Sequence, residues 1–399
     1  MAPKPLDVAV AQDRNARIAV AALFLSNGGL FANLLPRYPE IKADLHLSNA
    51  VYGAAIAAFS AGALVAGLAA AALIRRYRSS RVAVVGTIGI AAFVLVAGLA
   101  TTPLVLAAAL FLAGASDAIT DVAQNAHGLR VQRNYGRSII NSFHAVWAVG
   151  AIVGGLMGAG AIALHIPRAT HLAIAGAVFS AVVVIAYPYL LGGPDHDDHP
   201  SARSAGGPAA GIAVYATLAA LVVMAIADAT VEDAGSSWAT LYLRDSLDAS
   251  GAVAVFGYVA LVGFMLVGRL IGDRLVDRFG ERAVVRSGGF VTAAGMGAAL
   301  AFPSAPGTIA GFAAAGFGVA TLIPAAMHGA DQLPGMRPGT GLTVVTWLMR
   351  VGFLGAPLLV GVVADATSLR VGLLSVPVAG VVVMALAGAL SARRLPSQS

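Results

Sequence analysis

Twelve long apolar runs constrain this chain more than any other feature of its sequence. A membrane-spanning helix needs about 20 mostly apolar residues. Only 11% of the residues are charged, against roughly a quarter in an average soluble domain. This composition excludes a soluble globular or a disordered chain and predicts an all-α polytopic membrane protein. The predicted transmembrane helices cover residues 16–35, 50–74, 82–100, 104–128, 139–163, 170–191, 212–234, 251–271, 283–302, 308–327, 339–364 and 371–390.

The distribution of Lys and Arg predicts which side of the membrane each loop occupies. If the amino terminus is cytoplasmic, 19 of the 25 basic residues fall on the cytoplasmic side, five fall outside and Arg350 lies within a span. Because cytoplasmic loops carry an excess of Lys and Arg, both termini are predicted to be cytoplasmic. The chain contains no cysteine, which excludes disulfides and Cys-ligated metals.

Residues 192–211 divide the twelve runs into two sets of six. This stretch is rich in Gly, Pro and Ser and predicts a flexible cytoplasmic linker between an N-terminal six-helix bundle (1–191) and a C-terminal one (212–399). Its Asp and His run, 195–199, has metal-ligand chemistry but no rigid frame, so we expect no metal and no cofactor. The loops after spans two and eight both place Arg beside an aromatic residue, which indicates that the two sets are repeats.

The segment 268–282, GRLIGDRLVDRFGER, resembles the loop motif of the major facilitator superfamily. The resemblance covers the whole chain and implies the superfamily's fold: twelve transmembrane helices in two pseudo-symmetric halves that work by alternating access. In the first-half copy, Arg75 and Arg78 stand where the motif has Asp and Gly. The resemblance implies a cytoplasmic gate formed by charged residues of the two loops: Arg76, Arg81, Asp273, Asp277, Arg278 and Arg282.

About forty residues of spans four and five carry a narrower resemblance. The segments GASDAITDVAQNAHG (114–128), YGR (135–137) and NSFH (141–144) are similar to a YbjJ-like bacterial branch and, more distantly, to the fucose–proton symporters. The second likeness implies that Asp121 takes the proton or the sugar, with Asn125 beside it. The symporters also have a carboxylate on the first helix shortly before a proline. Here that position offers Asn33, which counts against proton-coupled sugar uptake.

Span four carries Asp117, Asp121 and Asn125 at intervals of four residues. This spacing places them on one stripe, about 6 Å apart along the helix. Ionisable residues in a span are costly and usually functional, so we expect the stripe to line the transport path. A helix cap or a packing hydrogen bond is the structural alternative. Asp117, Asp121 and His144 are the predicted proton-coupling residues.

Polar and aromatic residues in other spans predict a solute site. Arg350 lies about 16 Å into span eleven and needs a counter-ion, which can be Asp117 or Asp121, an anionic solute, or backbone carbonyls. Indole rings, hydroxyls and amides suit a small polar organic molecule. Glu232 and Asp233 are expected at a solvated helix end. The predicted substrate-binding residues are Asn27, Asn33, Asn125, Trp147, Asp228, Thr346, Trp347 and Arg350.

These patterns predict a secondary active transporter of the inner or plasma membrane that moves a small organic solute, coupled to protons, as a monomer and without nucleic acid. The missing first-helix acid favours efflux, with uptake of a sugar or an organic anion as the alternative. A non-transporting sensor is a remote alternative, since the longest predicted inner loop is the linker and offers no output domain. A Gly-rich phosphate loop and a Ser-His-Asp arrangement are absent, so no enzymatic activity is expected.

Overall fold

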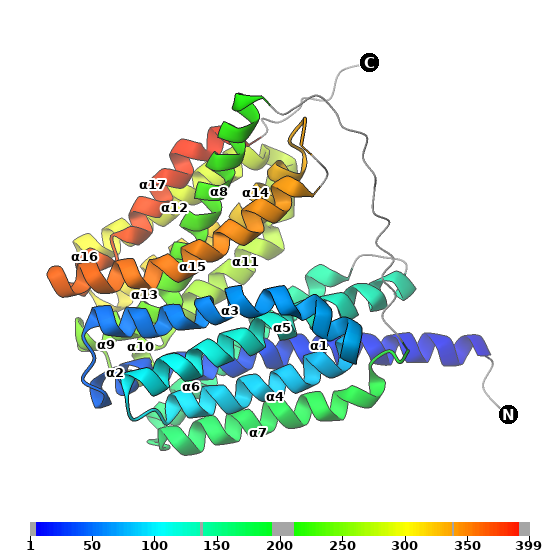
Figure 1. The fold of residues 1–399 in the computed structure, drawn as a ribbon. Helices are drawn as coiled ribbons and strands as arrows, with labels where there is room; N and C mark the ends of the chain where they lie inside the picture. Colours follow the sequence, from blue (N-terminus) through cyan, green and yellow to red (C-terminus); the bar gives the residue numbers. More distant parts are fainter. Residues whose placement is uncertain (1–4, 136–138, 194–210, 337–338, 391–399) are drawn as a thin grey trace. The chain divides into compact units, whose positions relative to one another are not determined.

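The computed structural model describes residues 5–135, 139–193, 211–336 and 339–390, with side chains from residue 12 onward. In this part of the chain, all regular structure is helical and twelve helical segments are long and apolar enough to cross a membrane (Figure 1). The prediction of an all-α polytopic membrane fold is confirmed. The predicted acidic and histidine run, 195–199, lies outside the described residues.

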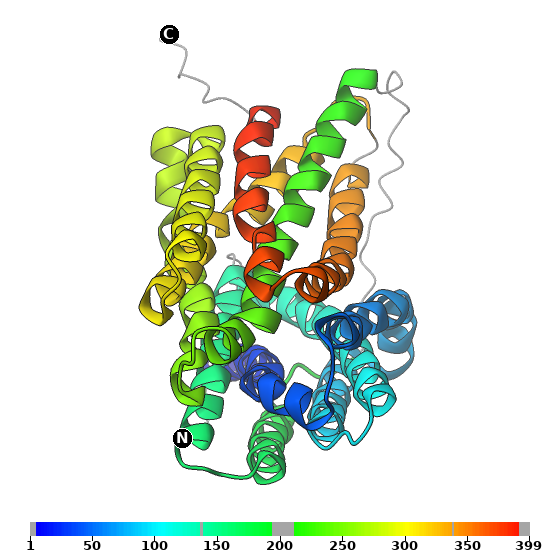
Figure 2. The ribbon, with the colours of Figure 1, turned by 90° about the vertical axis from the view of Figure 1, so that its left-hand side faces the viewer.

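The chain forms two compact units, one of residues 1–47 and 54–199 and the other of residues 48–53 and 200–399. The first turn of α3 therefore groups with the second unit. The helices that begin before residue 194 are α1 (Pro5–Leu34), η1 (Leu35–Arg37), α2 (Tyr38–Asp44), α3 (Asn49–Tyr77), α4 (Ser79–Gly98), α5 (Pro103–Tyr135), α6 (Ile140–Ala163), α7 (Arg168–Ala186) and η2 (Tyr187–Tyr189). The helices of unit 1 are seen nearly end-on in Figure 2.

The second unit has the same succession of long helices. Its helices are α8 (Ile212–Asp233), η3 (Ala234–Trp238), α9 (Ala239–Asp245), α10 (Gly251–Ala254), α11 (Phe256–Phe279), α12 (Glu281–Ala301), α13 (Ala305–Val319), α14 (Leu322–Asp331), α15 (Thr340–Ala366), α16 (Leu369–Gly372), α17 (Ser375–Leu386) and η4 (Ala387–Ala389).

Small residues set the packing inside each unit. Lipid tails are as apolar as the side chains, so membrane helices associate through close contact. In unit 1, a Cβ on Gly114 of α5 would overlap the backbone carbonyl of Phe59 on α3. In unit 2, a Cβ on Gly316 of α13 would overlap the carbonyl of Leu261 on α11. Backbone therefore lies against backbone at both crossings.

These two crossings belong to a wider internal repeat. Gly114 and Gly316 are 202 residues apart, and so are Phe59 and Leu261. The same interval relates two arginine contacts: Arg168 Nε donates to the carbonyl of Gly98, and Arg370 Nε donates to that of Leu300, each at 2.6 Å. The repeat that the two loops indicate thus extends to backbone contacts within each unit.

Span seven differs from the prediction. We expected it to end at residue 234, but α8 continues through the π-helical η3 into α9, and the span covers Ile212–Asp245. Asp233 is only 6% exposed. Its placement at a solvated helix end is therefore wrong, because the polar residues that follow it continue the helix.

Candidate functional site

Three residues predicted from separate spans meet on unit 1, and we call them the Asp117 group: Asn27, Asp117 and Trp147. The indole Nε1 of Trp147 donates to Asn27 Oδ1 at 2.7 Å, and Asn27 Nδ2 donates to Asp117 Oδ1 at 2.8 Å. The contact is possible because α1 and α6 touch closely, since a Cβ on Gly28 would overlap the carbonyl of Trp147. The amide of Asn27 thus links a carboxylate on α5 to an indole on α6.

A second set of predicted residues, the Asp121 group, lies further along α5: Asp121, Asn125 and His144. Asn125 Nδ2 donates to Asp121 Oδ1 at 2.9 Å. Asn125 Oδ1 lies 3.2 Å from His144 Nε2, which donates when that nitrogen carries the proton. The ring of Phe24 meets His144 edge-on, with the centroids 5.2 Å apart. Here, too, one amide links a carboxylate to a ring on α6.

The two groups lie at the margin of unit 1 and not in its core. Asn27 is 4% exposed and forms the buried base. Asp117, Asp121 and Trp147 are half-buried, and His144 is exposed. A carboxylate–amide–ring arrangement can accept a proton and can offer aromatic surface and hydrogen bonds to a small molecule.

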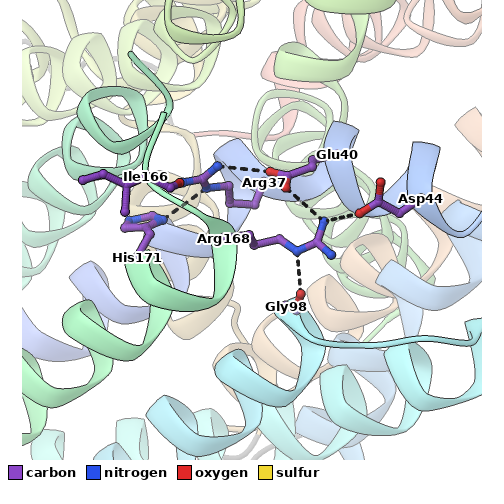
Figure 3. Close-up of polar contacts among 7 residues, drawn as sticks. All are labelled: Arg37, Glu40, Asp44, Gly98, Ile166, Arg168 and His171. Atoms are coloured by element: carbon purple, nitrogen blue, oxygen red, sulfur yellow. Dashed lines mark hydrogen bonds and ion pairs between the residues drawn. The ribbon is translucent and has the colours of Figure 1, made fainter. Parts of the chain in front are cut away.

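Asn33 belongs to a different part of unit 1 from Asn27. Its side chain is fully buried, its Nδ2 donates to the carbonyl of Gly29 at 2.7 Å, and its Oδ1 lies 2.8 Å from His171 Nε2. The other ring nitrogen, Nδ1, accepts a 3.3 Å hydrogen bond from Arg37 Nε (Figure 3). The ring is therefore the neutral tautomer with its proton on Nε2.

Two arginines complete this network, which we call the Arg37 network. Buried Arg37 also pairs with Glu40 at 3.1 Å and donates to the carbonyl of Ile166 at 2.8 Å. Arg168 pairs with Glu40 at 3.4 Å and with Asp44 at 2.8 Å (Figure 3). The network joins the region after α1 to the start of α7 and, through the carbonyl of Gly98, to the end of α4. Sequence reasoning treated both arginines only as loop charges.

Unit 2 holds an acid–arginine group that sequence reasoning missed in part: Asp228, Glu232 and Arg269. Arg269 of α11 lies 3.4 Å from Glu232 of α8. Asp228, one turn earlier on α8, is 2% exposed and lies close enough to both to interact electrostatically. Arg269 stands ten residues before the end of α11, about 15 Å along the axis, inside the predicted span 251–271, although sequence reasoning counted it with the basic residues of the cytoplasmic side.

The predicted residues of span eleven lie together on α15. Thr346 Oγ1 donates to the carbonyl of Leu342 on its own helix at 2.8 Å, and Trp347 is 52% exposed. Arg350 is half-buried and forms no ion pair with a described residue of unit 2. Just beyond it, the close contact of Gly352 with Ile226 and Ala229 brings α15 against α8. The predicted pairing of Arg350 with Asp117 or Asp121 stays a prediction.

The arginines of the predicted gate hold local contacts. Arg76 Nε donates to the hydroxyl of Tyr77, and Arg81 Nε donates to that of Tyr187 at 3.2 Å. Arg282 donates to the carbonyls of Gly388 and Leu390 at 2.8 Å. Arg278 lies over the ring of Phe279, while Asp273 and Asp277 are exposed and form no ion pair with a described residue of unit 2. The gating role stays a prediction.

Comparison with known proteins identifies the class. A family profile described as the Major Facilitator Superfamily matches residues 20–275, so the chain belongs to this superfamily of membrane transporters. It is 29% identical over 352 residues to the uncharacterized transporter y4wD of Sinorhizobium fredii, covering 88% of this chain and 92% of that one. It is 27% identical over 368 residues to the membrane protein MosC of Rhizobium meliloti, covering 92% and 88%.

Solved structures share the fold. A mutant form of the nucleoside transporter NupG superposes with a TM-score of 0.75 at 13% identity, covering 94% of this chain and 99% of that chain. A D-xylose–proton symporter superposes with a TM-score of 0.68 at 14% identity, covering 93% and 96%. The protein is thus a multi-pass membrane transporter of the major facilitator superfamily. The narrower likenesses to YbjJ and to fucose symporters stay predictions.

Proposed function

We propose that this protein moves a small organic solute across the membrane by alternating access, in exchange for or together with protons, and that Asp117 and Asp121 carry the proton. The observation that carries the proposal is the repeated carboxylate–amide–ring arrangement on α5. Asp117 reaches Trp147 through Asn27, and Asp121 reaches His144 through Asn125. In each case the charge state of an acid is linked to an aromatic ring that can contact a solute.

The chemistry of the Asp117 group supplies a coupling mechanism. Ionised Asp117 accepts from the amide nitrogen of Asn27, which leaves the amide oxygen for Trp147. A proton on Asp117 Oδ1 makes that oxygen a donor, and the amide of Asn27 can then rotate and present its oxygen to the acid. Its NH₂ then faces the indole N–H, which can only donate. In that rotated arrangement the hydrogen bond from Trp147 to Asn27 is lost, and this is the coupling step that we propose.

The Asp121 group responds differently to the same event. If the amide of Asn125 rotates, its NH₂ faces His144 Nε2, and a neutral imidazole can accept there by placing its proton on Nδ1. The hydrogen bond to His144 survives by a change of tautomer, while the 2.9 Å bond from Asn125 Nδ2 to the backbone carbonyl of Asp121 is given up. We therefore assign the strict coupling switch to Asp117 and a proton-transfer role to Asp121 and His144.

The solute would be small, polar and partly aromatic or amphipathic, because Trp147 offers a ring face beside the amides and carboxylates of unit 1. The predicted residues of unit 2, Trp347, Thr346 and Arg350, offer a ring face, a hydroxyl and a charge of their own. Outward transport is the favoured direction. Asn33 occupies the place of the symporters' first-helix acid, and its amide is already engaged within the Arg37 network.

The first experiment is a thermal-shift screen of purified protein against nucleosides, pentoses and hexoses, organic anions and amphipathic amines, at pH 5.5 and 7.5. A ligand that binds the folded state raises the melting temperature by mass action. We expect one class to stabilise the protein with a pH dependence that Asp117→Asn removes. Asp248→Asn, in an exposed loop, is the matched control. If no class stabilises the protein at either pH, the result counts against a small polar solute and favours a lipid-like substrate or a role other than transport.

Proteoliposomes then test the coupling with the solute so identified. Asp117→Asn and Asp121→Asn should abolish accumulation against a gradient and leave counterflow exchange. Trp147→Phe keeps an aromatic ring but removes the donor, and should lower the number of protons moved per solute. Unchanged accumulation by Asp117→Asn would refute the assignment. Accumulation driven by an inward proton gradient would identify uptake as the direction.

A further inference from the structure

Unit 2 contains an apolar groove that the transport proposal does not use. It lies between α11 and α12, with α13 as its floor, and has a volume of about 320 Å³. Leu275 and Phe279 line one wall, Val284 and Val291 the other, and Phe317 the floor. Two hydroxyls, those of Ser287 and Thr321, are the polar side chains of the lining. The volume is in the range that holds a small molecule or part of a lipid.

The groove follows from how the three helices pack. Both α11 and α12 lie against α13, the first at Gly268 beside Ala320 and Phe317, the second at Gly288 beside Gly318. The chain turns between them at Gly280, whose φ of +83° permits an abrupt reversal. The wall formed by α12 includes small residues such as Ala283, which leaves the space between the helices partly unfilled.

The length of the groove matches one leaflet of a membrane. It extends along α11 from Phe279, the last residue of that helix, back to Gly268. Eleven residues of α-helix measure about 16 Å. Half of the hydrocarbon core of a bilayer is about 15 Å thick. The span Gly251–Phe279 has 29 residues, about 43 Å, and exceeds the hydrocarbon core of about 30 Å. The groove therefore begins at the level of the head groups and runs towards the middle of the span.

Two arginines, Arg278 and Arg282, stand at the end of the groove where the two helices meet, and Arg286 stands one turn further along α12. Arg278, Arg282 and Arg286 each immediately precede a lining residue, namely Phe279, Ala283 and Ser287. Arg278 and Arg286 are exposed and form no ion pair with a described residue of unit 2, whereas Arg282 is held by the carbonyls of Gly388 and Leu390. Two guanidinium groups are therefore available to an anion beside the mouth of the groove.

We propose that this groove is a binding site for an anionic phospholipid, with one acyl chain between α11 and α12 and the phosphate held by Arg278 and Arg286. The apolar lining suits an acyl chain, and the depth of about 16 Å suits the length of that chain. The two arginines suit the phosphate. Basic pockets between transmembrane helices recognise anionic head groups in this way. Arginine suits the phosphate because its planar fork makes two parallel hydrogen bonds.

The test uses purified, delipidated full-length protein and two lipids with identical acyl chains, phosphatidylglycerol and phosphatidylcholine. Native mass spectrometry gives the dissociation constant of each, and thermal unfolding gives the stabilisation. We expect phosphatidylglycerol to bind about tenfold more tightly, equivalent to about 1.4 kcal/mol. Equal binding of the two lipids would overturn the proposal.

Three variants separate the head-group and acyl-chain contributions. Arg278→Gln with Arg286→Gln removes the charge and should abolish the preference for phosphatidylglycerol without altering the groove. Ser287→Trp, or the smaller change Ala283→Leu, fills the groove and should weaken the binding of both lipids. Ala298→Trp, exposed on the same helix but outside the lining, is the control. If both groove-filling variants bind phosphatidylglycerol as the control does, the acyl chain does not enter the groove and the proposal is wrong.

Discussion

Arg78 holds a backbone conformation that suits glycine. Its φ is +75° and its ψ is 146°, almost the values of Gly280, which stands 202 residues later at +83° and 152°. Side chains in this region cost about 1–3 kcal/mol. The sequence already marked the position, because Arg78 stands where the superfamily's motif has glycine.

Arg78→Gly is therefore expected to stabilise the folded protein by about 1 kcal/mol, and Gly280→Ala to destabilise it by a similar amount. Thermal unfolding of the purified variants measures both. Arg78→Ala separates the backbone from the charge, since alanine removes the guanidinium but keeps the strain. Equal melting temperatures for Arg78→Gly and Arg78→Ala would show that the backbone carries no strain at this position.

Arg37 provides a second prediction at this scale. Its guanidinium donates hydrogen bonds to His171, Glu40 and the carbonyl of Ile166 in a buried site. Arg37→Gln should destabilise the protein by about 3–5 kcal/mol, because the loss of one partner leaves buried polar groups unpaired. Arg37→Lys should retain only part of the lost stability, since an ammonium cannot reproduce the several fixed hydrogen bonds of the planar guanidinium. Lys42→Gln is a half-buried control with an expected change within about 0.5 kcal/mol; an equal effect of the two glutamine variants contradicts the assigned role.

The members of these groups differ in how readily the sequence predicts them. Asp117, Asp121 and Asn125 are predictable because their spacing on one helix fixes their common face. Arg37 and His171 stand 134 residues apart, and no local pattern relates them. The pairing of Arg269 with Glu232 was not predicted, because an arginine near the end of an apolar run is typical of a loop that follows a span.

At the scale of elements, glycine contacts decide which helices can approach each other. Gly114→Ala and Gly316→Ala should each lower the melting temperature strongly, because the added methyl meets the carbonyl of Phe59 or Leu261. Gly67→Ala and Gly263→Ala are matched controls on α3 and α11, with no atom within 4 Å of the added methyl. They should be neutral or stabilising, since alanine favours helix by about 1 kcal/mol. Equal losses in both pairs would refute the close-contact explanation.

Helix positions were largely predictable, and their ends were less so. Eleven spans begin and end within nine residues of the predicted bounds because hydropathy marks the segment that must lie in lipid, whereas span seven ends 11 residues later than predicted. The exception at span seven has a physical reason. Asp233, Gly235 and two serines interrupt the apolar run, yet Ser237 Oγ donates to Asp233 Oδ1 at 2.9 Å inside the helix. This bond gives one of the two carboxylate oxygens of Asp233 a partner within the span, which continues where hydropathy alone would end it.

For the whole molecule, the sharpest prediction from the sequence concerns orientation. The excess of arginine in alternate loops predicts cytoplasmic termini. Because the chain has no cysteine, single substitutions give an unambiguous readout. Ser246→Cys, exposed after α9, should react with an impermeant maleimide in intact cells, and Gln332→Cys, exposed after α14, only after permeabilisation. The reverse pattern would invert the predicted topology.

The π-helical η3 gives the seventh span a mechanical property that a plain α-helix lacks. Its wide turn contains one residue more than an α-helical turn. Conversion of η3 to α-helix would therefore rotate everything beyond it by about 100° and move it by about 1.5 Å along the axis. The carbonyl of Ser237, inside this turn, already accepts a 2.6 Å hydrogen bond from the hydroxyl of Tyr52. The span thus contains one extra residue in its π-helical turn, and the hydrogen bond from Tyr52 stabilises that turn.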